Sequence, residues 1–472
     1  MKYLSLYLLL ILPMGIGAQS FISYMTGDST DVQTNHESGY LLAGGGPDSD
    51  AAMRWLIQKA NGGDVLILRA SGSDGYNNYL YSELGVDVNS VETILFQEAS
   101  AATNPYVLRR IEEAEVIFLA GGDQSVYRDY WRDTPVADGI NNLISEKGGA
   151  VGGTSAGMAI LGEVYYAPEN GSLDSEEALN DPFHPDVEGL TSEPFLTLPH
   201  LANTLTDTHF EQRDRQGRLL VMLARTSLWN NQPVRAIACN DATAVAIEPD
   251  GTARVFGEFP DFPDYAWFIT SACTDEGFGP EILESGQPIT WNNNGQALSG
   301  YRLAGNVNGS MSFNLPSWSP DGGGFWHYWS AVEGDMQYIS PGNAPAMCGP
   351  SFTQLIDDDR HTLVYPNPAA GILNIQTPRP ITSLRLLDEL GKTALFEQLQ
   401  QPFGRPFLSG TSAGRLQILE NTNSSADPIG HASANIYTLN LQGIPPGFYT
   451  LEGLDSRSGE IIRNRIYIMR NY

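Results

Sequence analysis

The sequence has little cysteine, few basic residues and almost no long apolar runs. Its three cysteines, Cys239, Cys273 and Cys348, lack the C-x-x-C spacing of a zinc or redox site, so we expect no metal and no cofactor. Lys and Arg total 26 against 55 Asp and Glu, which gives a formal net charge of −29. Nucleic-acid binding needs cations that neutralise phosphates, so this balance argues against such a partner. In an exported protein Cys273 could pair with Cys348 and leave Cys239 free, although spacing alone does not fix a disulfide.

The first 18 residues have the pattern of an export signal. Lys2 provides a positive start, residues 4–12 are apolar, and residues 15–18 are small enough for cleavage after Ala18. This run is shorter than the roughly 20 apolar residues that span a bilayer, and no later segment reaches that length. A buried N-terminal strand is the alternative interpretation. We expect a signal peptide over residues 1–18 and a mature protein that is not integral to the membrane.

The chain has 472 residues, so the part that follows the expected signal peptide is long enough for more than one domain. Apolar strands alternate with capped helices between about residues 39 and 250, which predicts an α/β fold with a parallel sheet. Short stretches rich in Trp, Tyr, Phe, Asn and Gly then favour β-structure and turns. The predicted divisions are a catalytic domain over 21–350, with a motif core at 39–250 and a β-rich extension at 250–350, a linker at 351–361, and a tail at 362–472.

One short motif points to nucleophilic chemistry. Residues 152–157 read Gly-Gly-Thr-Ser-Ala-Gly and lie between an apolar pair and a helix-compatible run. A serine on a tight strand-to-helix turn, flanked by small residues, is how α/β hydrolases expose a nucleophile. The N–H groups that begin the following helix suit a developing oxyanion. Ser155 is therefore the candidate nucleophile, and a glycine-rich turn that binds an anion is the alternative.

A serine nucleophile needs a base and a group that orients it. His209 lies in a polar stretch, residues 207–218, but by spacing it differs little from His200. Asp241 lies between two short β-type runs and is the candidate orienting acid, unless it is an ordinary turn aspartate.

Three segments in this order resemble the cyanophycinase and aspartyl-dipeptidase group of serine peptidases: Gly-Gly-Asp-Gln at 121–124, Gly-Thr-Ser-Ala-Gly at 153–157, and Asp-x-His-Phe-x-x-Arg-x-Arg-x-Gly-Arg at 207–218. The resemblance covers about residues 39–250. It implies a class I glutamine-amidotransferase-like, flavodoxin-like fold. It also implies a catalytic triad of Ser155, His209 and Asp241, an oxyanion hole from Gly122 and Ala156, and substrate contacts from Gln124, Asp207, Arg213, Arg215 and Arg218.

The arginines suit the carboxylates of the aspartyl substrates that this resemblance implies, because Arg binds a carboxylate with a bidentate fork. Their offsets of two and five residues do not fit one face of a regular helix, so we expect Arg213 and Arg215 to diverge. The chain departs from the group at two positions, where Thr208 replaces a Gln and Asp241 replaces a Glu. An aspartate can still orient an imidazole. The threonine bears on what the pocket recognises, and the expected substrate is an aspartyl-containing peptide or a cyanophycin-like polymer.

Four segments of the tail carry a second resemblance: residues 364–369, 373–375, 387–392 and 446–449. They resemble the type IX secretion sorting domains. This resemblance implies a β-sandwich, passage through the periplasm of a Gram-negative bacterium, and release or attachment at the cell surface with the type IX machinery as partner. A plain adhesive β-sandwich is the alternative.

Together these patterns predict a secreted serine exopeptidase that hydrolyses peptide or isopeptide bonds next to aspartyl residues through an acyl-enzyme on Ser155. The alternative is a non-catalytic surface binding protein that retains the peptidase fold.

Overall fold

The computed structural model describes residues 19–169, 171–230, 233–271 and 279–342, and, beyond these, the backbone of the strands of the tail. The expected signal peptide, the linker, and Cys273 and Cys348 lie outside the described residues, whereas Cys239 is buried with a free thiol. The chain forms two compact units. The first comprises Met1–Ala224, Val234–Ser271 and Pro280–Pro345, and the second Arg225–Pro233, Ala272–Gly279 and Ala346–Tyr472.

The first unit contains a mixed sheet of ten strands in the order β1-β4-β3-β5-β6-β2-β11-β12-β15-β16. Its central strands β4, β3, β5, β6 and β2 are parallel, as the alternation of strands and helices predicts. The strands that flank them pair antiparallel, so the sheet is not purely parallel. The bounds are β1 Phe21–Gly27, β2 Gly39–Ala43, β3 Asp64–Arg69, β4 Ser90–Phe96, β5 Val116–Leu119, β6 Ala150–Thr154, β11 Ala244–Ile247, β12 Thr252–Phe256, β15 Met311–Asn314 and β16 Ser319–Pro320.

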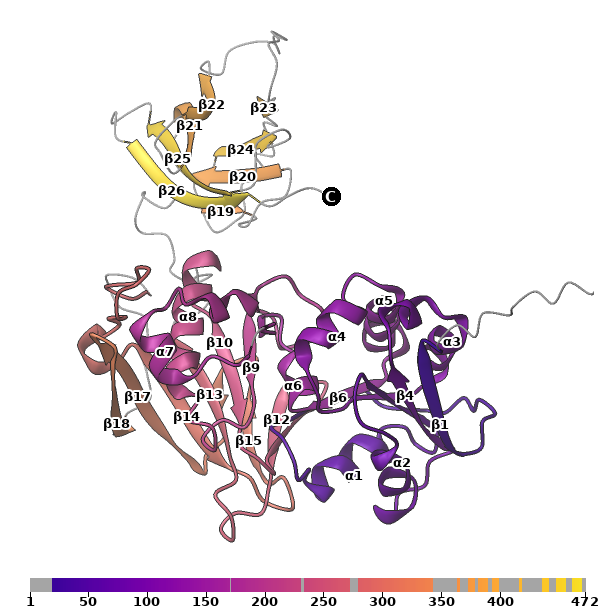
Figure 1. Cartoon of the computed structure of the whole chain (residues 1–472). Coiled ribbons are helices and arrows are strands. Elements are labelled where there is room, and N and C mark those ends of the chain that lie inside the picture. The colour runs from indigo at the N-terminus through magenta and orange to yellow at the C-terminus, as the bar shows by residue number, and fades with distance from the viewer. Residues whose placement is uncertain are drawn as a thin grey trace, which may run out of the picture. The chain divides into compact units, whose positions relative to one another are not determined.

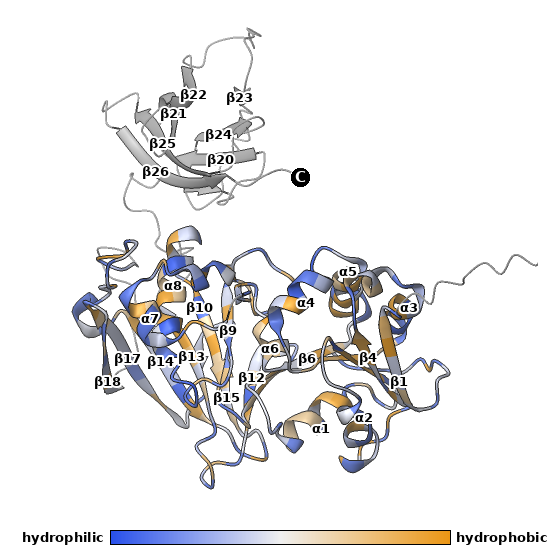
Figure 2. Ribbon diagram, in the orientation of Figure 1, coloured by the Kyte–Doolittle hydropathy of each residue, from blue (hydrophilic) through white to orange (hydrophobic). Residues whose placement is uncertain are grey.

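Helices cover both faces of the parallel strands, which explains why these strands are apolar throughout. In β2, Leu41 packs in a core with Leu56 of α1, and Leu42 packs on the opposite face in a core with Val107 of α3. Figure 1 shows α1 and α2 on one side of the sheet and α3, α4 and α5 on the other, and Figure 2 shows the apolar strands between them. The helices are α1 Asp50–Gln58, α2 Gly75–Asn78, α3 Pro105–Glu113, α4 Gln124–Trp131, α5 Pro135–Asn142, α6 Ala156–Ala159, α7 Ser175–Asn180 and α8 Gln216–Asn230, with shorter helical turns at Tyr79–Glu83, Ala99–Thr103, Leu143–Lys147, Pro185–Gly189 and Asn293–Gly295.

A second sheet, of six strands in the order β18-β17-β14-β13-β10-β9, combines the end of the motif core with the aromatic-rich region. The rings of Phe268 on β13 and Phe313 on β15 stack with centroids 4.2 Å apart, so the core is continuous between the two sheets. The two short strands expected around Asp241 form, but β10 belongs to this sheet and β11 to the first. Asp241 therefore lies where the chain crosses between the sheets. The bounds are β9 Thr204–Asp207, β10 Arg235–Cys239, β13 Tyr265–Ser271, β14 Leu298–Ala304, β17 Gly324–Val332 and β18 Asp335–Gly342, and a separate pair is β7 Tyr165–Tyr166 with β8 Leu190–Thr191.

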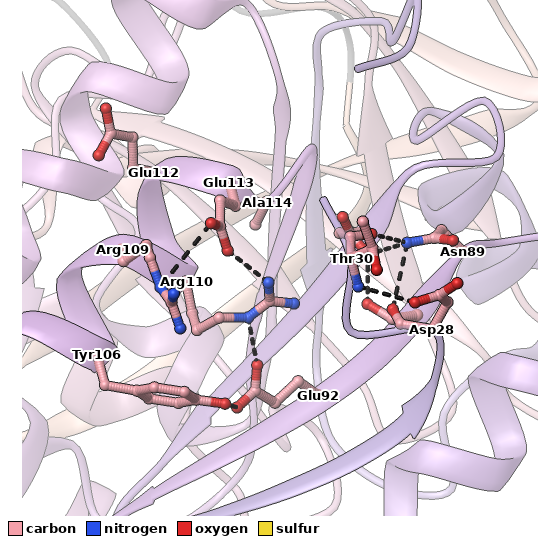
Figure 3. A network of polar contacts seen from close by, with 12 residues as sticks. Asp28, Thr30, Asn89, Glu92, Tyr106, Arg109, Arg110, Glu112, Glu113 and Ala114 are labelled. Atoms are coloured by element: carbon pink, nitrogen blue, oxygen red, sulfur yellow. Dashed lines mark hydrogen bonds and ion pairs between the residues drawn. The ribbon is translucent and has the colours of Figure 1, made fainter. Parts of the chain in front are cut away.

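A buried ion pair ties the outer strands of the first sheet to α3 (Figure 3). Arg110 Nε donates to Glu92 Oε2 over 2.6 Å, and a second arm of the guanidinium reaches Glu113. The hydroxyls of Tyr106 and Ser23 also donate to Glu92, whose side chain is 0% exposed. A buried carboxylate is costly unless it is paired and hydrogen-bonded, and here both conditions are met. β1 precedes residues 39–250, the range for which the sequence predicts alternating strands and helices, so this strand was not expected.

The second unit contains the strands of the tail in two four-stranded sheets, ordered β19-β20-β24-β23 and β22-β21-β25-β26. Among the described residues of the whole chain, no helix is both long enough and apolar enough to cross a membrane. The tail strands are β19 Leu363–Tyr365, β20 Ile372–Thr377, β21 Ile381–Asp388, β22 Thr393–Gln398, β23 Leu416–Gln417, β24 Asn435–Asn440, β25 Gly447–Asp455 and β26 Ile461–Ile468.

Candidate active site

Ser155 occupies a sharp turn between β6 and α6. Its backbone has φ 52° and ψ −116°, a conformation that a non-glycine residue rarely adopts. The small residues of the motif make this turn possible, because α6 packs very closely on the sheet: a Cβ on Gly157 would lie 1.9 Å from the carbonyl oxygen of Leu119. The turn thus holds the Ser155 hydroxyl at the C-terminal end of the parallel strands, where open α/β sheets bind ligands.

The side chains of Ser155, His209 and Asp241 form one continuous chain of contacts. Ser155 Oγ lies 2.7 Å from His209 Nε2. His209 Nδ1 is hydrogen-bonded to Asp241 Oδ1 on its other side. The imidazole is 10% exposed and the carboxylate 34% exposed. This geometry can move a proton from the hydroxyl to the imidazole while the carboxylate holds the ring, as nucleophilic acyl transfer requires.

The end of β2 holds the backbone of all three segments in place. Three successive carbonyl oxygens accept from three loops that are far apart in sequence, so one short segment sets the relative positions of the serine, the histidine and the acid. The bonds are Ser155 N to Ala43 O at 3.0 Å, His209 N to Gly44 O at 2.9 Å, and Ala242 N to Gly45 O at 3.0 Å.

The position of Gly45 requires glycine. Its φ is +147°, and a Cβ at this position would lie 2.1 Å from His209 Cε1. Any larger residue would therefore displace the imidazole. From sequence alone the glycines at 44–46 appear only as the end of a strand, although three glycines directly after a buried strand could have indicated a close approach by another group.

Burial holds the pKa of His209 below its ordinary value. The hydrogen bond to the Asp241 carboxylate opposes this shift in pKa, and the charges of Arg213 and Arg215 add to the shift. The imidazole is consequently neutral around pH 7, as a general base must be.

The expected oxyanion donors lie beside the serine. Ala156 is the first residue of α6, and Gly122 belongs to the turn after β5, where a Cβ on the preceding Gly121 would lie 3.6 Å from Ser155 Cβ. Within the described part of the chain, neither the Gly122 nor the Ala156 N–H has a protein acceptor. Both are therefore available to a ligand.

The expected substrate-binding arginines separate into two kinds. Arg218 donates to both carboxylate oxygens of Asp207, and its side chain is 4% exposed. Arg215 is also buried, where it donates to the carbonyl and hydroxyl oxygens of Thr208 and lies 3.5 Å from Asp207. Arg213 is exposed and has no ion pair among the described residues. Arg213 and Arg215 diverge because residues 208–215 form a turn before α8 rather than a helix.

Two further polar residues flank the site. Gln124 begins α4, and its side-chain amide donates to the carbonyl of Tyr166 over 3.3 Å. The N-cap of α1 is Ser49, and the neighbouring Asp48 accepts from Thr154 Oγ1, next to the serine, over 2.6 Å. In the described ranges, no three His, Cys, Asp or Glu side chains converge as metal ligands would.

Comparison with known proteins identifies a peptidase domain. Residues 73–255 match the family described as peptidase family S51. The cyanophycinase of Synechococcus elongatus is 28% identical over 237 residues, which are 48% of this chain and 68% of that protein. The cyanophycinase of Trichormus variabilis is 27% identical over 180 residues, 38% of this chain and 54% of that protein.

Among solved structures, the alignment with a peptidase from an acI-B1 Actinobacterium covers 49% of this chain and 93% of that chain, at 17% identity and a TM-score of 0.35. The matched segment contains every residue of the Ser155–His209–Asp241 chain, whereas β2 precedes it and β13 to β18 follow it. The match and the curated relatives show that this chain contains a serine-type peptidase domain that is similar to family S51.

Proposed function

We propose that this protein is a secreted serine exopeptidase that hydrolyses peptide or isopeptide bonds next to aspartyl residues through an acyl-enzyme on Ser155. The observation that carries this proposal is the 2.7 Å contact between Ser155 Oγ and His209 Nε2, which continues from the imidazole to Asp241. We infer that the α/β core is of the class I glutamine-amidotransferase-like kind, with the nucleophile after the strand β6.

In the proposed reaction, Ser155 Oγ attacks the scissile carbonyl carbon while His209 Nε2 takes the hydroxyl proton. The free N–H groups of Gly122 and Ala156 stabilise the negative oxygen of the tetrahedral intermediate. The imidazolium then gives its proton to the leaving amine, and the acyl-enzyme forms. Water, deprotonated by the same imidazole, then attacks the ester, and the imidazolium returns the proton to Ser155 Oγ as the ester C–O bond breaks and the acid product leaves. Asp241 accepts the hydrogen bond from the Nδ1–H group of His209 throughout and stabilises the imidazolium.

Preference for an aspartyl residue is supported by Arg213, which has no ion pair within the part of the chain that the structure describes. Arg215 and Arg218 already neutralise Asp207 inside the protein, so we assign them to holding the loop that carries His209. Arg213 is exposed, and its charge acts on His209. A guanidinium at that position can pair with a substrate carboxylate beside the scissile bond.

Matched peptides that differ only in aspartyl against asparaginyl at the cleaved residue test this assignment. The wild-type protein is expected to prefer the aspartyl member of α- or β-linked pairs. Arg213→Ala should lower kcat/KM for that member by about 10- to 100-fold, the value of a hydrogen bond to a charged group, and leave the asparaginyl member nearly unchanged. It should also raise the pKa of His209, because a repelling positive charge is removed. Since the neutral imidazole is the active form, the acid limb of the pH–rate profile should then move to higher pH.

Arg109→Ala is the matched control, because Arg109 is 59% exposed on α3. It should alter neither the preference nor the pH profile. Equal losses on aspartyl and asparaginyl peptides in Arg213→Ala would refute carboxylate recognition by this residue. Absence of cleavage for every α- and β-linked aspartyl peptide would instead count against the substrate class and favour a non-catalytic binding role.

We further propose that the two ends of the chain direct export. Residues 1–18 would be removed as a signal peptide, and residues 362–472 would form a type IX sorting β-sandwich. The arrangement of the tail strands in two four-stranded sheets is compatible with a sandwich. None of the residues assigned to catalysis lies in the tail.

Deletion of residues 362–472 should leave an active peptidase that accumulates in the periplasm. Mass spectrometry of the full-length secreted protein should show an N-terminus at or near Gln19. Fractionation followed by an activity assay distinguishes the outcomes. Normal secretion of the truncated protein would contradict the assignment of the tail as a sorting domain. Loss of activity in soluble, folded truncated protein would mean that the tail is required for catalysis.

A further inference from the structure

Glu211 lies two residues after His209, in the turn between β9 and α8, and both of its carboxylate oxygens accept hydrogen bonds. Oε1 accepts from the indole N–H of Trp267 over 2.9 Å. Oε2 accepts from Arg302 Nη2 over 2.7 Å and from Asn240 Nδ2 over 2.9 Å. Three donors on three different elements thus converge on one side chain that is 21% exposed.

The bond to Asn240 links the loop of the base to the loop of the acid. Asn240 immediately precedes Asp241 and is 0% exposed. Its side-chain oxygen also accepts from the backbone N–H of Glu211 over 3.2 Å, so the two residues bind each other reciprocally. Next to them, the N–H of Asp241 donates to Gln212 Oε1 over 3.1 Å. Movement of either loop would therefore break several bonds at once.

The other two donors come from outside the matched peptidase segment. Trp267 on β13 and Arg302 on β14 both follow residue 255, where the match ends. Arg302 also lies over the ring of Tyr265 at 3.6 Å, which fixes the guanidinium from a second side. The β-rich region thus supplies the cation and the indole that bind the partly buried Glu211 carboxylate.

We propose that Glu211 is a positioning residue that holds His209 and Asp241 in hydrogen-bonding geometry, and that Arg302 and Trp267 of the β-rich region hold Glu211. This inference rests on the proposed function, because it assigns the imidazole and the carboxylate their roles in catalysis. Glu211 itself does not contact Ser155 and acts only through the two loops. The β-rich region therefore contributes to catalysis by holding Glu211 in place.

The test uses the full-length protein and a fluorophosphonate, which labels a catalytic serine without need of a known substrate. Glu211→Gln keeps the size of the side chain but removes its charge and points an amide donor at groups that donate. The second-order labelling rate at its pH plateau should fall by about 10- to 100-fold, the cost of a misplacement of around 1 Å in an active site. The acid limb should move to lower pH, because a loosened Asp241 no longer favours the imidazolium. Thermal unfolding monitors the folded fraction.

Glu248→Gln is a closely matched control. Glu248 accepts from the indole N–H of Trp55 and from Lys59 Nζ, each over 3.0 Å, and is 23% exposed, but it lies at the opposite end of β11 from Asp241. Its variant should lose stability while its labelling rate per folded molecule and its acid limb stay within about twofold and a few tenths of a pH unit of wild type.

Arg302→Met is a second test variant. It removes the ion pair with Glu211 but keeps the bonds of Glu211 to Asn240 and Trp267. It should lower the labelling rate about tenfold and add little to Glu211→Gln, because contacting residues of one network are not additive. Wild-type rate and pH profile in a folded Glu211→Gln or Arg302→Met protein would overturn the positioning role. Equal effects of Glu211→Gln and Glu248→Gln would do the same. Labelling of Ser155→Ala would instead overturn the proposed function itself.

Discussion

Replacement of Ser155 by alanine is expected to abolish turnover and leave the fold intact. Loss of the nucleophile in a serine triad costs on the order of 10⁶-fold in kcat, and the residual rate comes from binding and the oxyanion donors. The backbone at this position is already strained at φ 52°, and alanine meets the same steric limits as serine, so folding should change little. Peptide hydrolysis by purified wild-type and variant proteins measures the loss, and binding of an uncleaved substrate should persist.

Two controls make this expectation specific. A fluorophosphonate should label the wild-type protein at Ser155 alone, as peptide mapping would show. Thr154→Ala removes the neighbouring hydroxyl that donates to Asp48 and should retain most of the activity, because this hydroxyl lies outside the Ser155–His209 contact. Wild-type turnover in Ser155→Ala would mean that another group is the nucleophile.

The sequence predicts the local part of this site well because its requirements are local. A tight turn between a strand and a helix needs small residues at fixed offsets from the serine, and residues 152–157 meet that need within six positions. The alternation of apolar strands and helices likewise predicts the parallel strands, since each βα unit is continuous in sequence. Neither pattern depends on which strands become neighbours.

The parts of the site that the sequence does not predict depend on tertiary neighbours. The carbonyls of residues 43–45 bind three loops from different parts of the chain, and no spacing in the sequence encodes that convergence. The division of β10 and β11 between two sheets is also invisible, although it places Asp241 at the crossing. The arginines illustrate the same limit: helical offsets indicate that Arg213 and Arg215 diverge, but only the buried Asp207 decides which of them is committed to the protein.

Loss of the base should be nearly as severe as loss of the nucleophile, and loss of the acid less so. His209→Ala removes the only imidazole in contact with Ser155 Oγ within the described part of the chain, so kcat should fall on the order of 10⁶-fold. Asp241→Asn should lower kcat by about 10²- to 10⁴-fold, because an amide can still bind Nδ1 but no longer favours the tautomer and the imidazolium that the reaction needs. The 34% exposure of this carboxylate places the expected loss toward the lower end, since water can reach the ring when the acid is changed.

His200→Ala is the control that separates this assignment from the other histidine of the region. His200 Nε2 lies 3.0 Å from the carbonyl oxygen of Pro249, in an exposed turn, and has no contact with Ser155. Steady-state kinetics on the three variants should therefore rank His209→Ala below Asp241→Asn, with His200→Ala close to wild type. An inactive His200→Ala beside an active His209→Ala would require a different base. Similar rates in Asp241→Asn and wild type would show that the backbone bonds at the end of β2 are sufficient to orient the imidazole without its carboxylate, because His209 N remains bound to Gly44 O in that variant.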